Sequence, residues 1–328
     1  MRVRQSKAVI YALLLVTAFS AKTSWSAELI PLRATYAAIS GAFAPLWIAQ
    51  DKGLFNKYGL DVELKYMLSA TGTQSLLSGR VDIVNPGTEL VEAGLAGARV
   101  AFFIGILNRA VLSVYGKPEL KRPDDLRGKT LGVTQPGSTT DLAARILLRQ
   151  LGLKPGKEVR IAFIQGLPDM ITALIEGRID AAVISAPSTV KLRHAGFKEL
   201  VDIGARDIPM IHAGLATTRN FIKGNADALQ RYAQAYIEAT KVARTDAKTT
   251  KHVIAKWTKT DNKEELEETY ATYVKAWEQA PYVSPAAMQT VLDFAVNPTA
   301  KKAKPEQFID NSFVAELEQS GFIKQLYK

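Results

Sequence analysis

The chain has no cysteine among its 328 residues, which excludes disulfide bonds, thiol catalysis and lipid attachment through a cysteine. No apolar run reaches the roughly 20 residues that a membrane-spanning helix needs. The sequence also lacks the motifs of serine hydrolases, zinc proteases and phosphate-binding loops. Its three histidines, His194, His212 and His252, are too widely spaced to predict a metal site. We therefore expect no catalytic residues, no metal and no cofactor.

Positive charge is in modest excess, and little of it is clustered. The net charge of +10 falls to +6 when the first 26 residues, which carry four basic residues and no acidic one, are removed. The one tight basic group, at residues 301–304, is typical of a solvated linker. This pattern excludes a nucleic-acid-binding surface, whereas the overall field would favour small anions.

The N-terminus has the pattern of a secretory signal peptide. Basic residues at positions 2, 4 and 7 precede an apolar stretch over residues 8–20, and the small residues Ser24 and Ser26 predict cleavage before Ala27. The apolar stretch is short for an uncleaved membrane anchor, which is the alternative interpretation. The mature chain is expected to be free in the periplasm.

One short pattern occurs twice. Residues 76–84 read Leu-Leu-Ser-Gly-Arg-Val-Asp-Ile-Val, and residues 174–183 repeat two aliphatics, one free position, Gly-Arg, a β-branched residue, Asp and an apolar run. The aliphatics would end a helix, the glycines (Gly79 and Gly177) would stop it in the left-handed conformation, and the apolar run would begin a strand. A unit used twice predicts two similar α/β lobes that face each other across a cleft.

Strands and helices alternate along the first two-thirds of the chain, which predicts an α/β fold. Strands are expected at residues 29–36, 61–67, 81–84, 101–106, 111–115, 130–134, 159–164 and 200–203. The continuous apolar run of residues 101–106 is typical of a buried parallel sheet. Lobe 1 is expected to start with residues 27–113, lobe 2 to span residues 114–217, and residues 218–328 to return to lobe 1.

The last third of the chain is mostly helical in pattern. Helices are expected at residues 226–243 and 264–277, and a third is expected to begin at Ser284-Pro285. Because such helices cannot bury their apolar faces alone, we expect them to pack on lobe 1.

Two stretches carry a family resemblance. Residues 45–55, Pro-Leu-Trp-Ile-Ala-Gln-Asp-Lys-Gly-Leu-Phe, followed by Tyr-Gly-Leu-Asp-Val-Glu at residues 58–63, resemble the opening motif of the periplasmic substrate-binding proteins of nitrate/sulfonate/taurine transporters. These form the SsuA/THI5-like, or NMT1-like, family. Residues 125–130 are similar to that family's entry into its second lobe. The resemblance implies a two-lobed type II periplasmic-binding fold, an interlobe ligand cleft, and delivery of a small-molecule ligand to ABC transporter permease subunits.

Candidate ligand-binding residues lie in the turns after the predicted strands. In open α/β sheets, ligands bind beyond the carboxyl ends of strands, where helix N-termini present free N–H groups. The candidates in lobe 1 are Ser40, Gly41, Phe43, Thr71, Thr73 and Asn85, and those in lobe 2 are Gly137, Ser138, Thr139, Thr140, Gln165 and Ser185. The hydroxyl and N–H groups of residues 138–140 suit a sulfonate, carboxylate or nitrate without an arginine.

Several of these residues have a purely structural alternative. Ser138 could serve only as a helix cap with Asp141, and Thr71 and Thr73 are equally compatible with simple caps. Phe43 could belong to the core rather than to an apolar wall of the site. His212, near the return to lobe 1, could touch a ligand or be a buried structural residue.

These patterns together predict a monomeric receptor with two hinged lobes. The hinges are expected at residues 111–117 and 210–218, and a solute that contacts both lobes would favour the closed state. The family's ligands imply a small, anionic organic solute, such as a sulfonate, nitrate, or an aromatic or heterocyclic compound. Two alternatives remain: a sensor subunit with the same fold, and an exported enzyme related to pyrimidine-precursor synthases. The absence of cysteine opposes the enzyme, because those synthases depend on a cysteine-rich motif.

Overall fold

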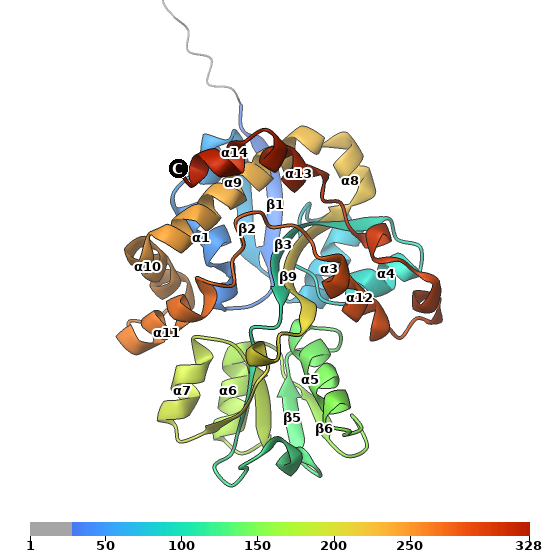
Figure 1. The fold of residues 1–328 in the computed structure, drawn as a ribbon, viewed down its shortest axis with the longest axis vertical. Coiled ribbons are helices and arrows are strands. Elements are labelled where there is room, and N and C mark those ends of the chain that lie inside the picture. Colours follow the sequence, from blue (N-terminus) through green and yellow to red (C-terminus); the bar gives the residue numbers. More distant parts are fainter. Residues whose placement is uncertain (1–27) are drawn as a thin grey trace, which may run out of the picture.

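The computed structural model describes residues 28–328, which form two lobes joined by two crossings of the chain (Figure 1). The predicted signal segment, residues 1–26, lies outside the described residues. None of the helices in the described part is both long enough and apolar enough to cross a lipid bilayer.

The sheet of lobe 1 is built from two pairs of strands. The strands β1 (Ile30–Tyr36) and β2 (Leu60–Tyr66) are parallel, whereas β3 (Val100–Arg109) and β9 (Pro209–Thr218) are antiparallel. The predicted strand at residues 81–84 is reduced to two bridging residues: Ile83 pairs with β1, and Val84 pairs with β9. These bridges join the two pairs into one layer, with the carboxyl ends of β1 and β2 at the edge that faces lobe 2.

The prediction of a parallel sheet around residues 101–106 is wrong, because β3 pairs only with the antiparallel strand β9 among the named strands of the described chain. All of β3 except its last residue is buried. A continuous apolar run indicates burial on both faces of a strand, and it carries no information about the direction of the neighbouring strand.

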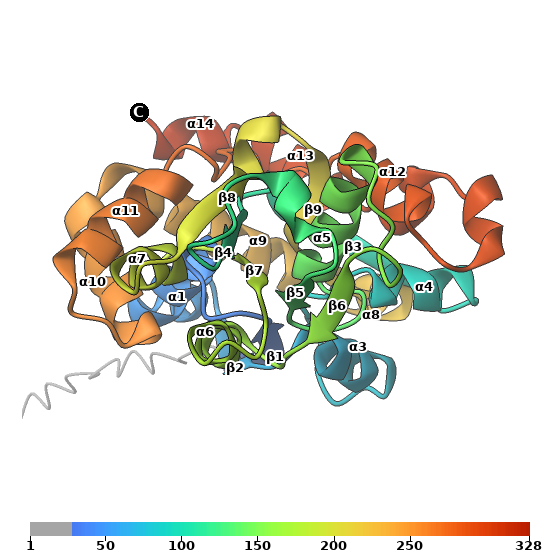
Figure 2. The same cartoon turned by 90° about the horizontal axis from the view of Figure 1, so that it is seen from below.

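The sheet of lobe 2 has five strands in the order β6-β5-β7-β4-β8. Its strands are β4 (Ser113–Gly116), β5 (Thr130–Val133), β6 (Arg160–Phe163), β7 (Ala181–Ile184) and β8 (Lys198–Asp202). The first three in spatial order are parallel, and β4 is antiparallel to both of its neighbours. The helices α5 (Thr139–Gln150), α6 (Leu167–Ile175) and α7 (Ser188–His194) flank this sheet (Figure 2).

The two crossings run side by side between the lobes. The first passes from β3 to β4 through residues 110–112, and the second passes from β8 to β9 through residues 203–208. The N–H of Ala110 donates to Ile208 (3.2 Å), and the N–H of Ile203 donates to Leu112 (2.9 Å). The second crossing therefore comes earlier than the predicted hinge at residues 210–218 and the predicted boundary at residue 217. Those residues form β9, which is paired with β3 in lobe 1.

The C-terminal helices pack on lobe 1, as the sequence predicted. They are α8 (Arg219–Gly224), α9 (Ala226–Thr245), α10 (Ala247–Thr258), α11 (Lys263–Tyr273), α12 (Pro285–Asp293), α13 (Ser312–Gln319) and α14 (Phe322–Leu326). The long helix α9 contacts α1 (Ala44–Asp51) and α2 (Leu54–Lys57), and the three share one apolar core. Helix α10 was not predicted, although Val253, Ile254 and Trp257 have a helical spacing.

Both copies of the repeated pattern end a helix in the same way. At the end of α3 (Ser69–Leu77), the N–H of Gly79 donates to Leu76 (3.0 Å), and the N–H of Arg80 donates to Ser75 (2.8 Å). At the end of α6, Gly177 and Arg178 make the matching bonds (3.1 and 2.9 Å). Both glycines are left-handed, with φ of 73° and 76°. This pair of hydrogen bonds is the Schellman motif, so the predicted helix stop is confirmed in both lobes.

The aspartate of each copy of the repeated pattern forms hydrogen bonds with the neighbouring strand. Asp82 accepts a hydrogen bond from the backbone N–H of Arg33 on β1 (2.8 Å) and also pairs with the guanidinium of Arg33. Asp180 accepts the corresponding bond from the N–H of Thr130 on β5 (2.9 Å) and pairs with Lys117. The repeat therefore positions the turn that follows each helix, and the carboxylates have a structural role.

Candidate functional site

A cavity with about 60 Å³ of free space lies between the lobes, where the carboxyl ends of the parallel strands meet. We call it the interlobe cavity. Seven of the predicted residues line it: Ser40, Phe43, Asn85, Ser138, Thr139, Thr140 and Ser185. It is also lined by residues that were not predicted, among them Ala37, Tyr66, Leu68, Ser69, Leu112, Thr134, Gln135, Gly166, Leu167 and His212. Most of these lie in or beside the same post-strand turns, so the rule that selected the first group could have found them.

Five predicted residues do not line the cavity. Thr71 and Gln165 are exposed. Thr73 donates a hydrogen bond to Glu89 (3.2 Å), and Gly41 is buried against α11. Gly137 instead contacts lobe 1 through its carbonyl group. Helix α3 begins at Ser69, two residues earlier than predicted, so Thr71 and Thr73 lie inside the helix and neither caps it.

One wall of the cavity is the N-terminus of α5. The Ser138 hydroxyl accepts the N–H of Asp141 (3.3 Å), so the predicted cap is present. The Asp141 carboxylate reaches back to the N–H of Gly137 (2.9 Å) and pairs with Arg145 (2.9 Å), which balances its charge. Within the described chain, the N–H groups of Thr139 and Thr140 have no hydrogen-bond partner. They are the free donors that a helix N-terminus offers to an anion.

The hydroxyl groups around this wall are connected to one another. Thr140 Oγ1 lies 3.0 Å from Ser138 Oγ and 2.9 Å from Thr134 Oγ1. The Ser185 hydroxyl of lobe 2 donates to Ser40 Oγ of lobe 1 (3.0 Å). These contacts hold the polar groups in fixed positions before any solute arrives, which reduces the ordering cost of binding.

No Asp, Glu, Lys or Arg side chain of the described chain lines the interlobe cavity. The buried carboxylate of Glu89 in lobe 1 accepts the N–H of Gly87 (2.8 Å) and the Thr73 hydroxyl. Burial raises the pKa of Glu89 above its usual value. Among residues 28–328, the titratable groups that line the cavity are Tyr66 and His212.

The lobes already touch at the cavity rim. The N–H and hydroxyl of Thr88 both donate to the Gly137 carbonyl across the cleft (2.7 and 3.0 Å). The N–H of Gly41 donates to Ala186 (3.3 Å). The structure therefore represents a closed arrangement of the lobes.

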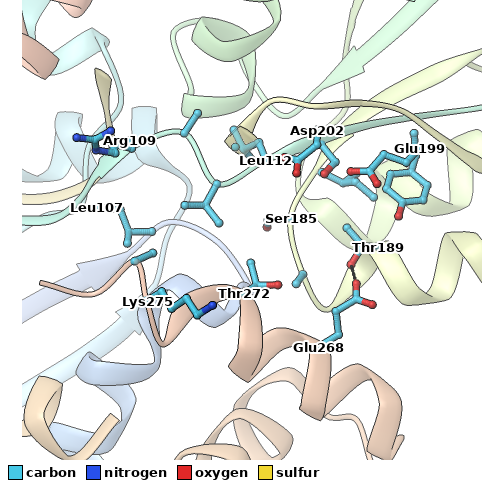
Figure 3. Close-up of a pocket in the computed structure, with 18 of the residues that line it drawn as sticks. Leu107, Arg109, Leu112, Ser185, Thr189, Glu199, Asp202, Glu268, Thr272 and Lys275 are labelled. Carbon is cyan, nitrogen blue, oxygen red and sulfur yellow. Dashed lines mark hydrogen bonds between the residues drawn. The ribbon is translucent and has the colours of Figure 1, made fainter. Parts of the chain in front are cut away.

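A larger crevice of about 660 Å³ shares Ser185 and Leu112 with the lining of the interlobe cavity (Figure 3). We call it the second crevice. Figure 3 shows Glu199 and Asp202 on the lobe 2 side and Lys275 on the lobe 1 side. It lies over β4, which is antiparallel to its neighbours, and over β8, which is the edge strand of the sheet. Ligands in such folds bind instead at the carboxyl ends of the parallel strands. Size alone therefore does not make it the principal site.

An ion-pair group beside the second crevice joins α7 of lobe 2 to α11 of lobe 1. The Arg193 guanidinium contacts Glu268 (2.6 Å) and Glu264 (3.0 Å), and Thr189 donates to Glu268 (2.8 Å). Burial disfavours the ionised form of Glu268, but its hydrogen bonds with Arg193 and Thr189 outweigh burial and lower the pKa of Glu268. The group can form only when the lobes are closed.

We expect Arg193→Ala to weaken solute binding about two- to fivefold, because partly exposed ion pairs contribute at most about 1 kcal/mol. The loss should shrink in 1 M salt, which screens the pair. Because the pKa of Glu268 is lowered in the closed state, the contribution is present at neutral pH and is lost as the pH falls through that pKa. Titration calorimetry measures the affinity. Arg178→Ala, which breaks a pair within lobe 2, is the control, and equal effects of the two variants would contradict this role.

Among residues 28–328, no three histidine, aspartate or glutamate side chains form a group that could hold a metal ion. The model of the NMT1-like family matches residues 27–259. The chain belongs to the NMT1-like family. The family resemblance noted in residues 45–63 is thereby confirmed.

Known proteins with similar sequence or structure agree with this membership. A protein of Brucella abortus (strain 2308), named for its inferred role as a binding protein, is 29% identical over 181 residues, which are 53% of this chain and 54% of that protein. The chain thus matches about half the length of its curated relatives. The alkanesulfonate-binding protein SsuA of Xanthomonas axonopodis pv. citri, bound to MOPS, has a TM-score of 0.68 at 16% identity, with 89% of this chain and 98% of that chain covered.

The nitrate-binding protein NrtA of Synechocystis PCC 6803 has a TM-score of 0.71 at 17% identity, with 89% of each chain covered. At such identities the likeness shows the fold alone. It confirms the predicted two-lobed α/β periplasmic-binding fold.

The NMT1-like opening motif has a structural role in this chain. Trp47 and Phe55 are fully or almost fully buried in the core of lobe 1, and Gly53 is left-handed (φ 64°) between α1 and α2. Trp47 contacts Tyr36 (ring centroids 5.7 Å apart), which in turn contacts Phe43, so the motif packs beside the turn of residues 37–43 that supplies Ser40 and Phe43 to the interlobe cavity. Phe43 is itself 3% exposed, so it belongs to both the core and the cavity wall.

Proposed function

We propose that this chain is a receptor that captures a small organic anion between its two lobes. The observation that supports this most strongly is the N-terminus of α5, whose free N–H groups at Thr139 and Thr140 border a cavity without a charged side chain. A helix N-terminus favours negative charge through its partial positive charge and its unpaired donors. An anion can therefore be bound without an arginine or lysine in contact with it.

The opposite part of the lining is apolar and limits the size of the solute. Phe43, Tyr66, Leu68 and Leu167 offer a surface for a hydrocarbon or aromatic group. A single water needs roughly 10–15 Å³ of such space, so 60 Å³ holds a few waters or one small solute. A short alkanesulfonate or carboxylate fits both the polar and the apolar part.

The same lining supports binding over catalysis. General acid–base catalysis needs a group whose pKa lies near the working pH. Burial raises the pKa of Tyr66, and burial lowers the pKa of His212 to about 4. Each group therefore keeps one protonation state around neutral pH. The absence of cysteine from the sequence removes the nucleophile of a thiol enzyme.

Location and partners follow from the signal pattern and the comparisons. The N-terminal signal pattern supports a periplasmic location for the mature chain, and related structures include periplasmic binding proteins. We propose that the closed, solute-loaded monomer delivers its solute to the permease subunits of an ABC importer. A sensor subunit would use the same binding event, and transport by the reconstituted importer separates the two.

Thermal unfolding of the mature chain, refolded to remove any bound solute, tests the proposal. The panel contains short alkanesulfonates, nitrate, aromatic carboxylates and neutral pyrimidines. A ligand at 100 times its Kd stabilises the folded state by about 2.7 kcal/mol, which raises Tm by several degrees. We expect such a shift with an organic anion. Shifts with neutral heterocycles alone would contradict the anion class, and a folded protein with no shift for any compound would contradict the receptor.

A further inference from the structure

His212 combines a buried position with an imidazole that reaches the interlobe cavity. It lies on β9, is 8% exposed and lines the cavity. Its Nδ1 lies 3.0 Å from the backbone nitrogen of Val111, in the first crossing between the lobes. Its carbonyl oxygen accepts the Thr139 hydroxyl at the start of α5 (2.9 Å). One residue therefore contacts a crossing, the helix N-terminus and the cavity.

The contact with Val111 determines which ring nitrogen carries the proton. A backbone N–H can only donate, so His212 Nδ1 must be the acceptor, and the proton of the neutral ring is then on Nε2. In the described part of the chain, the hydrogen bond made by the His212 ring is the one at Nδ1, and Nε2 has no partner. The neutral ring thus offers one unused N–H donor at the cavity.

We propose that His212 Nε2–H binds an acceptor oxygen of the solute, in a tautomer that the first crossing fixes through Val111. This inference rests on the proposed receptor function. The donor set at the site is then three N–H groups, those of Thr139, Thr140 and His212, and all three are uncharged. Such a set selects solutes that present lone pairs, such as sulfonates and carboxylates, and rejects solutes that present ammonium groups, because two donors would face each other.

Protonation of the ring would destroy this arrangement. A second proton would have to reside on Nδ1, against the Val111 N–H. In the described part of the chain, Tyr66 is the only other titratable group in the cavity lining, and no charged side chain lines the cavity that could stabilise an imidazolium. Burial lowers the pKa of His212 to about 4. Because this folded-state pKa lies below the unfolded value, stability is lost as the pH falls from about 6.5 towards 4. Solute binding should therefore hardly change between pH 6 and 8.

The tautomer is tested by ¹⁵N NMR of the whole mature chain, with histidine ring nitrogens labelled. The chain has three histidines, so the His212→Gln variant assigns the signal. We expect a protonated Nε2 and an unprotonated Nδ1 for His212 from pH 6 to 8. A proton on Nδ1, or titration of His212 in that range, would overturn the inference.

The solute contact is tested by adding methanesulfonate, nitrate or acetate to the labelled protein. We expect at least one of them to shift the Nε2 signal. If any of the three anions binds by calorimetry but leaves the Nε2 chemical shift unchanged, the proposed contact with the solute is wrong. If all three fail to bind while neutral pyrimidines do, the receptor stands and this inference falls.

Two substitutions of His212 distinguish the roles of its two ring nitrogens. His212→Asn keeps an acceptor near Val111 but has no donor at the Nε2 position, and we expect it to weaken anion binding about tenfold to a hundredfold. His212→Gln carries an amide donor close to the Nε2 position, and it should retain more affinity than His212→Asn. Equal affinity of wild type and His212→Asn, with both folded, would contradict the proposal.

Discussion

Gly87→Ala is expected to weaken solute binding by one to two orders of magnitude while leaving the ligand-free protein folded. A Cβ at Gly87 would lie 2.5 Å from the Gly137 carbonyl oxygen, which belongs to the other lobe, and would also crowd the Glu89 carboxylate. The carbonyl is backbone and cannot swing aside, so the lobes must separate. Overpacking of this kind costs about 1–3 kcal/mol, which here falls on the closed state. Titration calorimetry with the solute found by the panel measures the effect.

Gly224→Ala is the matched control, because a Cβ there meets nothing within 4 Å and its backbone has no positive φ. It should bind the solute as the wild type does. Gly87→Ala with wild-type affinity would show that the Gly87–Gly137 contact is absent from the bound state. A large decrease in the Tm of the solute-free Gly87→Ala variant would instead show that the added Cβ strains lobe 1 itself.

Trp277→Ala is expected to cost about 3–5 kcal/mol of folding stability, the usual range for a large aromatic removed from a core. Trp277 is fully buried, stacks on Tyr273 with ring centroids 5.9 Å apart, and donates its indole N–H to the Ala42 carbonyl (3.2 Å). It thereby joins the C-terminal helices to the turn that carries Ser40 and Phe43. We expect a fall in Tm of roughly 10 °C by differential scanning calorimetry.

Trp257→Ala provides the comparison for Trp277→Ala. Trp257 stacks on Trp47 at 5.6 Å but is only half-buried, so its removal should cost clearly less. Equal losses for the two variants would contradict the prediction that the cost of each substitution follows the burial of the tryptophan. If the Trp277→Ala variant binds the solute more weakly than the wild type at a temperature where it is folded, Trp277 also positions the site.

Local features of the chain were predictable where neighbouring residues determine them. The Schellman stops at Gly79 and Gly177 and the cap at Ser138 depend on a few adjacent residues, and all three are present. The direction of β3 and the point of return before Pro209 depend on which strands meet in three dimensions. An apolar run does not carry that information, and both predictions were wrong.

In the candidate site too, the features set by neighbouring residues were predictable and those set by tertiary structure were not. Ser40, Asn85, Ser138 and Ser185 line the cavity because the turns after parallel strands meet at one edge of each sheet. Thr71 and Thr73 were misplaced because α3 begins at Ser69, and a run of small polar residues offers several equivalent starts. His212 was not selected because it lies within a strand and reaches the cavity only through the pairing of β9 with β3. A lone histidine in an apolar strand carries no local signal of such a role.

The measurement that tests the account most directly is the distance between the lobes with and without solute. Because the chain has no cysteine, the double variant Gln74→Cys and Thr172→Cys places one spin label on α3 of lobe 1 and one on α6 of lobe 2, both at exposed positions. Pulsed electron paramagnetic resonance then reports the distance distribution. We expect saturating solute to narrow the distribution and move it to the short distance of the closed lobes. A solute that binds by calorimetry yet leaves the distribution unchanged would contradict capture between the lobes.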